Sequence, residues 1–85
     1  MAKYKIEIKR SAQKEIQCLP QQDTKRIIAK IQSLALNPRG PDSKKLSAEE
    51  RYRVRVGQYR ILYEICDDVL VVTVVKVANR REAYR

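Results

Sequence analysis

The chain contains no histidine, no tryptophan and no phenylalanine among its 85 residues. Without histidine, nucleophilic sites of the Ser–His–Asp and Cys–His kinds are excluded, and so is phosphodiester cleavage by a pair of histidines. The common zinc sites that use histidine are excluded as well, and two cysteines are too few for a four-cysteine site. We therefore expect no metal site and no other cofactor.

Cysteine and long apolar runs are also scarce. The spacing between Cys18 and Cys66 matches no zinc or redox motif, which predicts two free thiols in a reducing cytoplasm. The longest apolar run, residues 69–75, is too short to cross a membrane. Lysines interrupt the first nine residues before any apolar run develops, so no signal peptide is expected. These absences together predict a cytoplasmic protein.

The composition that remains suits one small basic domain spanning residues 1–85. Hydrophobic residues make up 44%, enough for one core, and the aromatic residues of that core must come from five tyrosines. The 19 basic and 10 acidic residues give a net charge of +9. Because this excess is concentrated, it predicts a polyanionic partner such as nucleic acid, a ribosome, an anionic membrane or an acidic protein. The alternative is a protein that is basic only for solubility.

The first half of the chain reads as one strand followed by two helices. Residues 4–9, YKIEIK, alternate between apolar and charged side chains and predict a half-buried strand. Ser11 stands where a helix N-cap belongs, so we expect a short helix over residues 11–18. Pro20 favours a break and the start of a second helix, residues 21–36. The apolar stripe of this second helix consists of Ile27, Ile28, Ile31, Leu34 and Ala35.

The second half reads as a loop followed by three strands. The proline and glycine of residues 37–42, NPRGPD, predict a loop that continues into an exposed Lys44-Lys45 pair. Three strand-like runs follow at residues 51–56, 59–65 and 69–77, joined by tight turns that favour an antiparallel meander. The last run is apolar on both faces, so we expect it to be the central strand. The fold class is therefore α+β, in the order β-α-α-β-β-β, with an antiparallel sheet packed against a helical hairpin.

An unusual charge pattern occupies residues 51–60, RYRVRVGQYR, which hold four arginines and no acidic residue. Arg53 and Arg55 alternate with valines, so arginines and valines lie on opposite faces of the strand. The meander would bring Arg60 to the same side. The alternative is that these arginines are solvated or paired with carboxylates, Arg60 for example with Glu64.

The basic tail that follows the last strand adds Arg80 and Tyr84, which share one side if the tail is helical. Guanidinium groups bind phosphate oxygens bidentately, and preorganised cations stabilise the transition state of phosphodiester cleavage. Such a site needs neither metal nor histidine if the nucleophile is the 2′-hydroxyl of the RNA. Tyr84 is alternatively a C-terminal hydrophobic plug. Further candidate RNA contacts are Lys44, Lys45, Lys76, Arg81 and Arg85.

Two stretches, YRVRVGQYRILYEI and VVTVVKVANRREAYR, resemble the RelE/ParE superfamily of bacterial type II toxins. The likeness covers nearly the whole chain and includes the LP bend of the helical hairpin and the NPRG loop. It implies a small antiparallel sheet packed on a helical hairpin. In the RelE branch it implies a ribosome-dependent endoribonuclease that cuts mRNA in the ribosomal A site by 2′-hydroxyl attack and leaves a cyclic phosphate.

The resemblance also implies residue roles. Arg53 and Arg55 match two basic residues on the first meander strand, and Arg60 matches an arginine on the next strand. Arg80 matches an arginine that follows the last strand, and Tyr84 matches a terminal tyrosine. By this likeness Arg60 and Arg80 clamp the scissile phosphate, and Tyr84 activates or stacks near the nucleophile.

The companion ParE branch shares this fold and acts on DNA gyrase without cleaving RNA. A gyrase inhibitor is therefore the alternative function, although the set of arginines and tyrosine favours the RelE branch. Either branch implies an acidic antitoxin that wraps the basic toxin and carries the complex to its operator.

Overall fold

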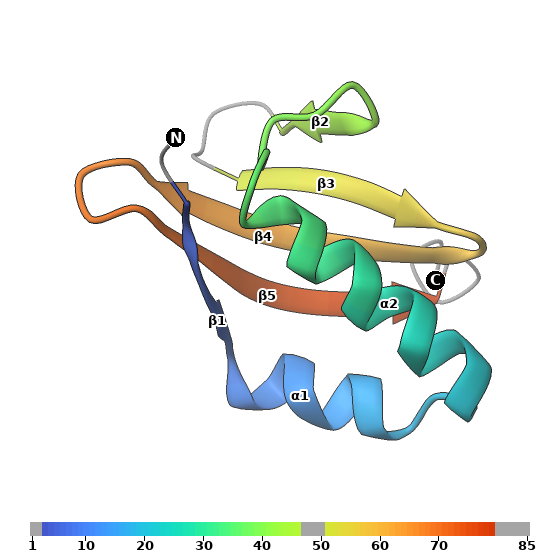
Figure 1. The fold of residues 1–85 in the computed structure, drawn as a ribbon. Coiled ribbons are helices and arrows are strands. Elements are labelled where there is room, and N and C mark those ends of the chain that lie inside the picture. Colours follow the sequence, from blue (N-terminus) through green and yellow to red (C-terminus); the bar gives the residue numbers. More distant parts are fainter. Residues whose placement is uncertain (1–2, 47–50, 80–85) are drawn as a thin grey trace.

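The computed structural model describes residues 3–46 and 51–79 as one five-stranded sheet with two helices on one face (Figure 1). The elements follow the chain as β1 (Lys5–Ile8), α1 (Arg10–Gln17), α2 (Gln21–Leu34), β2 (Ser43–Lys45), β3 (Arg51–Val56), β4 (Tyr59–Cys66) and β5 (Val71–Asn79). Their order across the sheet is β1-β5-β4-β3-β2. The predicted α+β class, with a helical hairpin packed on a sheet, is confirmed.

The sheet differs from the predicted meander at both of its edges. Lys44 and Lys45, expected in a loop, belong to the short edge strand β2, which pairs antiparallel with β3. At the other edge β1 pairs parallel with β5, with Ile8 opposite Val74, so the sheet is mixed. The two helices supply the long crossover connection that parallel pairing requires. Alternation within a strand predicts its buried face but does not determine the direction of its partner.

The prediction that Ser11 caps the first helix is wrong. Helix α1 begins at Arg10, and Lys9 occupies the N-cap in an extended conformation without a side-chain cap. The backbone nitrogen of Lys9 donates a hydrogen bond to the carbonyl oxygen of Val74 at 3.0 Å. Because the sheet hydrogen bonding continues to Lys9, the helix follows the strand directly and Ser11 lies inside its first turn.

Helix α2 follows the predicted break closely. Pro20 is its N-cap, and its apolar stripe places Ile27, Ile31 and Leu34 in the core. The hydroxyl of Thr24 donates to the carbonyl oxygen of Ile16 at 3.2 Å and ties α2 to α1. No helix in the two described ranges is both long and apolar enough to span a bilayer.

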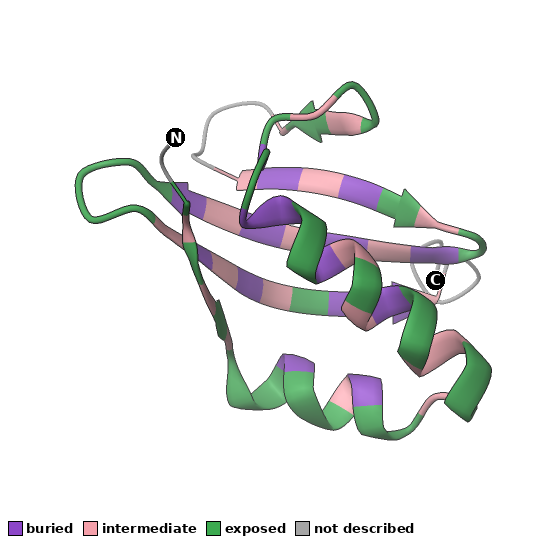
Figure 2. Cartoon of the chain, in the orientation of Figure 1, coloured by how far each residue is buried: buried purple, intermediate pink, exposed green. Residues whose placement is uncertain are grey.

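The core lies between the helices and the sheet, where buried residues alternate along β3, β4 and β5 (Figure 2). Tyrosine replaces the absent phenylalanine and tryptophan in this core. The rings of Tyr52 and Tyr63 stack with centroids 5.9 Å apart. The hydroxyl of the fully buried Tyr63 donates to the carbonyl oxygen of Pro38 at 2.6 Å, so the polar end of the side chain is satisfied.

Strand β5 is shorter at its start and less buried than the sequence indicates. Val69 and Leu70 belong to the turn, and Leu70 adopts a positive φ of 53°. Strand β4, rather than β5, lies in the middle of the sheet. Only the helix-facing side chains of β5 enter the core cluster, namely Val72, Val74 and Val77. The helices cover one face of the sheet, and Val71 and Val75 are therefore only partly buried.

Arg39 joins three distant segments at one end of the sheet. Its guanidinium donates to both carboxylate oxygens of Asp67 at 3.1 and 2.8 Å and to the hydroxyl of Tyr52 at 3.0 Å. The hydroxyl of Tyr4 donates to the same carboxylate at 2.6 Å. Arg39 therefore fastens the loop after α2 to the β4–β5 turn and to the N-terminal segment.

Acid is expected to remove the stabilisation that the Arg39–Asp67 pair supplies. Hydrogen bonds from Arg39 and then Tyr4 hold the pKa of the Asp67 carboxyl below its ordinary value of 3.8. Because the folded pKa is lowered, the contribution is present above pH 3.8 and is lost as the pH falls through the folded value. We expect the difference in Tm between wild type and Asp67→Asn to shrink below about pH 4. Thermal unfolding from neutral pH into strong acid measures this, and a constant difference contradicts it.

Candidate functional site

The sheet face opposite the helices carries the arginines that the sequence singles out. Arg53 and Arg55 are two residues apart on β3 and therefore share this open face. The tight turn at Gly57 and Gln58 sets the β3–β4 register so that Arg55 lies directly opposite Arg60. The prediction that these three arginines share one face of the sheet is confirmed by the pairing of β3 with β4.

The electrostatics of this group are unusual, because like charges directly opposite each other in a sheet are destabilising. Within residues 3–46 and 51–79, no carboxylate forms a hydrogen bond or ion pair with Arg53, Arg55 or Arg60. Glu64, an alternative partner for Arg60, instead accepts a hydrogen bond from Arg51 at 3.1 Å. The positive charge is therefore left for an external anion to neutralise.

Lys44 extends the arginine group toward the sheet edge, whereas Lys45 does not. Lys44 pairs with Arg53 across β2 and β3, so both lie on the open face. We call the set of Lys44, Arg53, Arg55 and Arg60 the cationic face. Lys45 lies opposite Tyr52, which points into the core, and so belongs to the other side of the sheet. Of these two neighbouring lysines, both predicted to contact RNA, only Lys44 lies on the cationic face.

Lys76 was also expected to contact RNA, but the structure pairs it with helix α1. Its ammonium lies 3.4 Å from one carboxylate oxygen of Glu15, and the other oxygen accepts a hydrogen bond from the backbone of Val77 at 3.0 Å. This contact occurs where the β4–β5 register shifts, next to Leu62. Lys76 is thus already neutralised, which the sequence could not reveal because its partner is 61 positions away.

The tail residues expected to complete the site lie outside the described residues: Arg80, Arg81, Tyr84 and Arg85. The described chain ends at Asn79, and its neighbour Ala78 is the partner of Arg60 across β4 and β5. The structure therefore describes the part of the predicted site that lies on strands, namely Arg53, Arg55 and Arg60.

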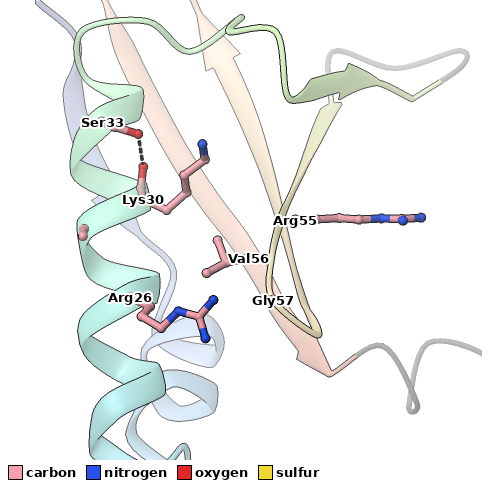
Figure 3. Close-up of a pocket in the computed structure, with 7 residues that line it drawn as sticks. Arg26, Lys30, Ser33, Arg55, Val56 and Gly57 are labelled. Carbon is pink, nitrogen blue, oxygen red and sulfur yellow. Dashed lines mark hydrogen bonds between the residues drawn. The ribbon is translucent and has the colours of Figure 1, made fainter.

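A second feature lies on the helix side of β3 and was not predicted. A cleft of about 570 Å³ separates α2 from the β3–β4 turn and is lined by Arg26, Ala29, Lys30, Ser33, Arg55, Val56 and Gly57 (Figure 3). Arg26 and Lys30 are one helical turn apart on α2, along the flank of its apolar stripe. That spacing is a signal in the sequence, but only tertiary structure places it opposite the turn.

The described part of the chain offers phosphate-binding groups and few metal ligands. It contains no cluster of three or more cysteine, aspartate or glutamate side chains that could hold a metal ion. Cys18 and Cys66 are exposed free thiols. Guanidinium forks that lack internal partners bind phosphate oxygens bidentately. The geometry of the cationic face therefore suits a polyanion such as an RNA backbone.

Comparison with known proteins defines the class. A family model described as ParE toxin of type II toxin-antitoxin system, parDE, matches residues 6–84. The chain belongs to the RelE/ParE superfamily of type II toxins.

Among individual relatives, it is 31% identical to toxin RelE1 of Methanocaldococcus jannaschii over 98% of this chain and 97% of that protein. Two solved complexes are similar in structure. The toxin of RelBE2 from Mycobacterium tuberculosis gives a TM-score of 0.84 at 25% identity, covering 94% of each chain. The archaeal RelE–RelB complex from Pyrococcus horikoshii gives 0.83 at 27% identity, covering 94% of this chain and 97% of that chain. These relatives are RelE proteins, so the chain is RelE-like within its superfamily.

Proposed function

We propose that this type II toxin is a ribosome-dependent endoribonuclease that cleaves mRNA in the ribosomal A site without a metal ion. RelE-like toxins are generally endoribonucleases. The observation that carries the proposal is the pairing of Arg55 with Arg60 on an open sheet face, with no carboxylate partner among the described residues. A fold that tolerates opposed like charges at this point gains from them only when an anion is bound.

The proposed reaction needs no group beyond the protein, the RNA and water. The 2′-oxygen attacks the adjacent phosphorus, the bond from phosphorus to the 5′-oxygen breaks, and the products are a 2′,3′-cyclic phosphate and a 5′-hydroxyl. Arg60 and Arg80 hold the scissile phosphate and stabilise the charge that builds on its oxygens. Arg53 and Arg55 extend this positive field to the neighbouring nucleotides.

Proton transfer in this scheme involves Tyr84 and solvent. Tyr84 takes the proton from the 2′-hydroxyl, provided that nearby arginines lower the pKa of its phenol. Arginines keep their protons at physiological pH, so water protonates the departing 5′-oxygen. Outer contacts to RNA come from Lys44 and from the tail residues Arg81 and Arg85. Lys45, on the helix side of the sheet, and Lys76, paired with Glu15, contribute less.

The proposed partner is a cognate acidic antitoxin in the cytoplasm. The solved relatives from Mycobacterium tuberculosis and Pyrococcus horikoshii are toxin–antitoxin complexes. A net charge of +9 favours a negatively charged partner that covers the basic surface. We expect this antitoxin to be the short acidic protein encoded beside the toxin gene and to carry the complex to its operator.

Mapping mRNA ends after expression of the toxin is induced in cells tests the proposed cleavage. We expect new mRNA 5′ ends within translated codons shortly after induction, because cleavage requires an mRNA in the ribosome. Purified toxin should cut the same positions in a reconstituted translation mixture. Intact mRNA in that mixture would contradict the nuclease assignment.

The second candidate, inhibition of DNA gyrase, is favoured by one finding, which is that the matching family model is that of ParE toxins. It predicts double-strand DNA breaks and a damage response upon induction, with translated mRNA left uncut. Measuring DNA breaks in the same induced cultures therefore separates the two functions.

A further inference from the structure

Glu15 joins helix α1 to strand β5 at the point where β5 is irregular. One of its carboxylate oxygens accepts a hydrogen bond from the backbone nitrogen of Val77 at 3.0 Å, and the other lies 3.4 Å from the ammonium of Lys76. We propose that Glu15 is a positioning residue for mRNA cleavage, because it fixes the end of β5 that leads into Arg80. This inference rests on the proposed function and on the role given there to Arg80.

Strand β5 carries one more residue than β4 in the stretch where the two strands pair. Tyr63 lies opposite Val74, whereas the preceding Leu62 lies opposite Lys76, so Val75 has no partner on β4. Such a β-bulge bends its strand and changes which side chains face each side of the sheet. Bulges are frequent next to active sites, where they redirect a side chain.

The bulge decides which residues of β5 face the core. Without the extra residue, Lys76 would lie opposite the fully buried Ile61 and so on the buried side of the sheet, where a lysine is costly. With the bulge, Val77 takes this place and enters the core cluster. A slip of one residue turns every later side chain to the other face. The bulge therefore also sets the register of the chain that continues to Arg80.

The outer edge of β5 loses its partner strand just before the bulge. Strand β1 pairs with β5 only as far as Val74, and the chain then turns into α1. Beyond that point, no strand in the described ranges pairs with this edge of β5. The carboxylate of Glu15 instead accepts the hydrogen bond from Val77. The bulge is thus fastened from a helix rather than from a neighbouring strand.

The fastened segment leads directly to the proposed phosphate clamp. Ala78 lies opposite Arg60, and Arg80 follows two positions later in the chain. A misplacement of about 1 Å can lower the rate of a reaction by about 10²-fold. A strand that slips at the bulge would carry Arg80 to a different distance from Arg60. Because both carboxylate oxygens of Glu15 contact β5, Glu15 acts through this strand rather than on the RNA.

The test is a double-mutant cycle measured as kcat for mRNA cleavage on saturating ribosomes and corrected for the folded fraction of each variant. Glu15→Ala should lower kcat by about tenfold in the wild-type background, but by less than about twofold when Arg80 is already alanine. A purely structural role would leave the corrected kcat unchanged or lower it equally in both backgrounds, and either result would overturn the proposal. Gln17→Ala, at an exposed position of the same helix, is the matched control and should leave kcat unchanged.

A conservative variant and hydrogen exchange test the contact itself. The amide oxygen of Glu15→Gln can still accept the hydrogen bond from Val77, so kcat should stay within about threefold of wild type. A glutamine variant as slow as alanine would overturn the role of this hydrogen bond. Exchange at the backbone amide of Val77 should be faster in Glu15→Ala than in wild type, and unchanged exchange would also overturn the proposal.

The cycle separates failure of this inference from failure of the proposed function. Wild type that cuts no mRNA on ribosomes would refute the proposed function and the inference with it. Full activity of Arg80→Ala would refute the role of Arg80 as a clamp. Cleavage that needs Arg80 but ignores Glu15 would refute only the positioning role.

Discussion

Replacing Arg60 with alanine is expected to lower the rate of mRNA cleavage by about 10²- to 10³-fold, the usual cost of losing one preorganised donor to transition-state charge. Arg60 is the expected phosphate clamp, and the turn at Gly57 fixes it opposite Arg55. Toeprinting of cut ends in a reconstituted translation reaction measures the rate. Arg60→Lys keeps the charge but loses the planar fork, so its activity should fall between wild type and alanine.

The Arg60→Ala variant should be slightly more stable than wild type. Removing one of two opposed like charges relieves a repulsion worth about 0.2–1 kcal/mol in the free energy of unfolding. Urea unfolding at low salt measures this gain, which excess salt should reduce. Arg10→Ala, at an exposed position of α1, is the matched control and should leave cleavage unchanged. Full activity of Arg60→Ala would contradict the assigned role, and a loss of stability would show that Arg60 is structural.

Replacing Tyr63 with alanine is expected to remove a large share of the free energy of unfolding. Tyr63 is fully buried and stacks on Tyr52, so its truncation leaves a cavity that costs about 3–5 kcal/mol. An 85-residue domain has a total stability of roughly 4–13 kcal/mol. The free energy of unfolding from urea titration gives the loss. A loss below about 1.5 kcal/mol would show that neighbouring side chains collapse into the space.

Tyr63→Phe separates packing from hydrogen bonding at this position. The ring stays in place, but the carbonyl oxygen of Pro38 loses the hydrogen bond that it accepts at 2.6 Å. We expect a loss of about 1–3 kcal/mol, because a buried acceptor is left without its donor. If phenylalanine proves as stable as tyrosine, the hydroxyl contributes nothing beyond the ring.

Local periodicity predicted the helices and the buried faces of the strands. The stripe of Ile27, Ile31 and Leu34 and the alternation along β3 each reflect one element with one face in the core. The errors arise where long-range pairing decides the outcome. The parallel partner of β1 and the edge strand β2 depend on segments far away in the sequence. Ser11 lost its expected role because Lys9 is held by Val74.

The candidate site was likewise predicted where local pattern decides the outcome and missed where long-range contacts do. Alternation and a tight turn sufficed to place Arg53, Arg55 and Arg60 together. Neither feature could show that Glu15 holds Lys76, or that Arg26 faces the β3–β4 turn, since both contacts join a helix to a distant strand. Charge patterns in a sequence thus predict what shares a strand face more reliably than what crosses between layers.

The insertion of β5 between β1 and β4 has a consequence for how the toxin is made. This strand, Val71–Asn79, is synthesised after the other four strands, and both of its neighbours need it to complete their pairing. A nascent chain therefore cannot close its sheet until β5 has left the ribosome, and β1 waits without its partner while most of the domain is being made.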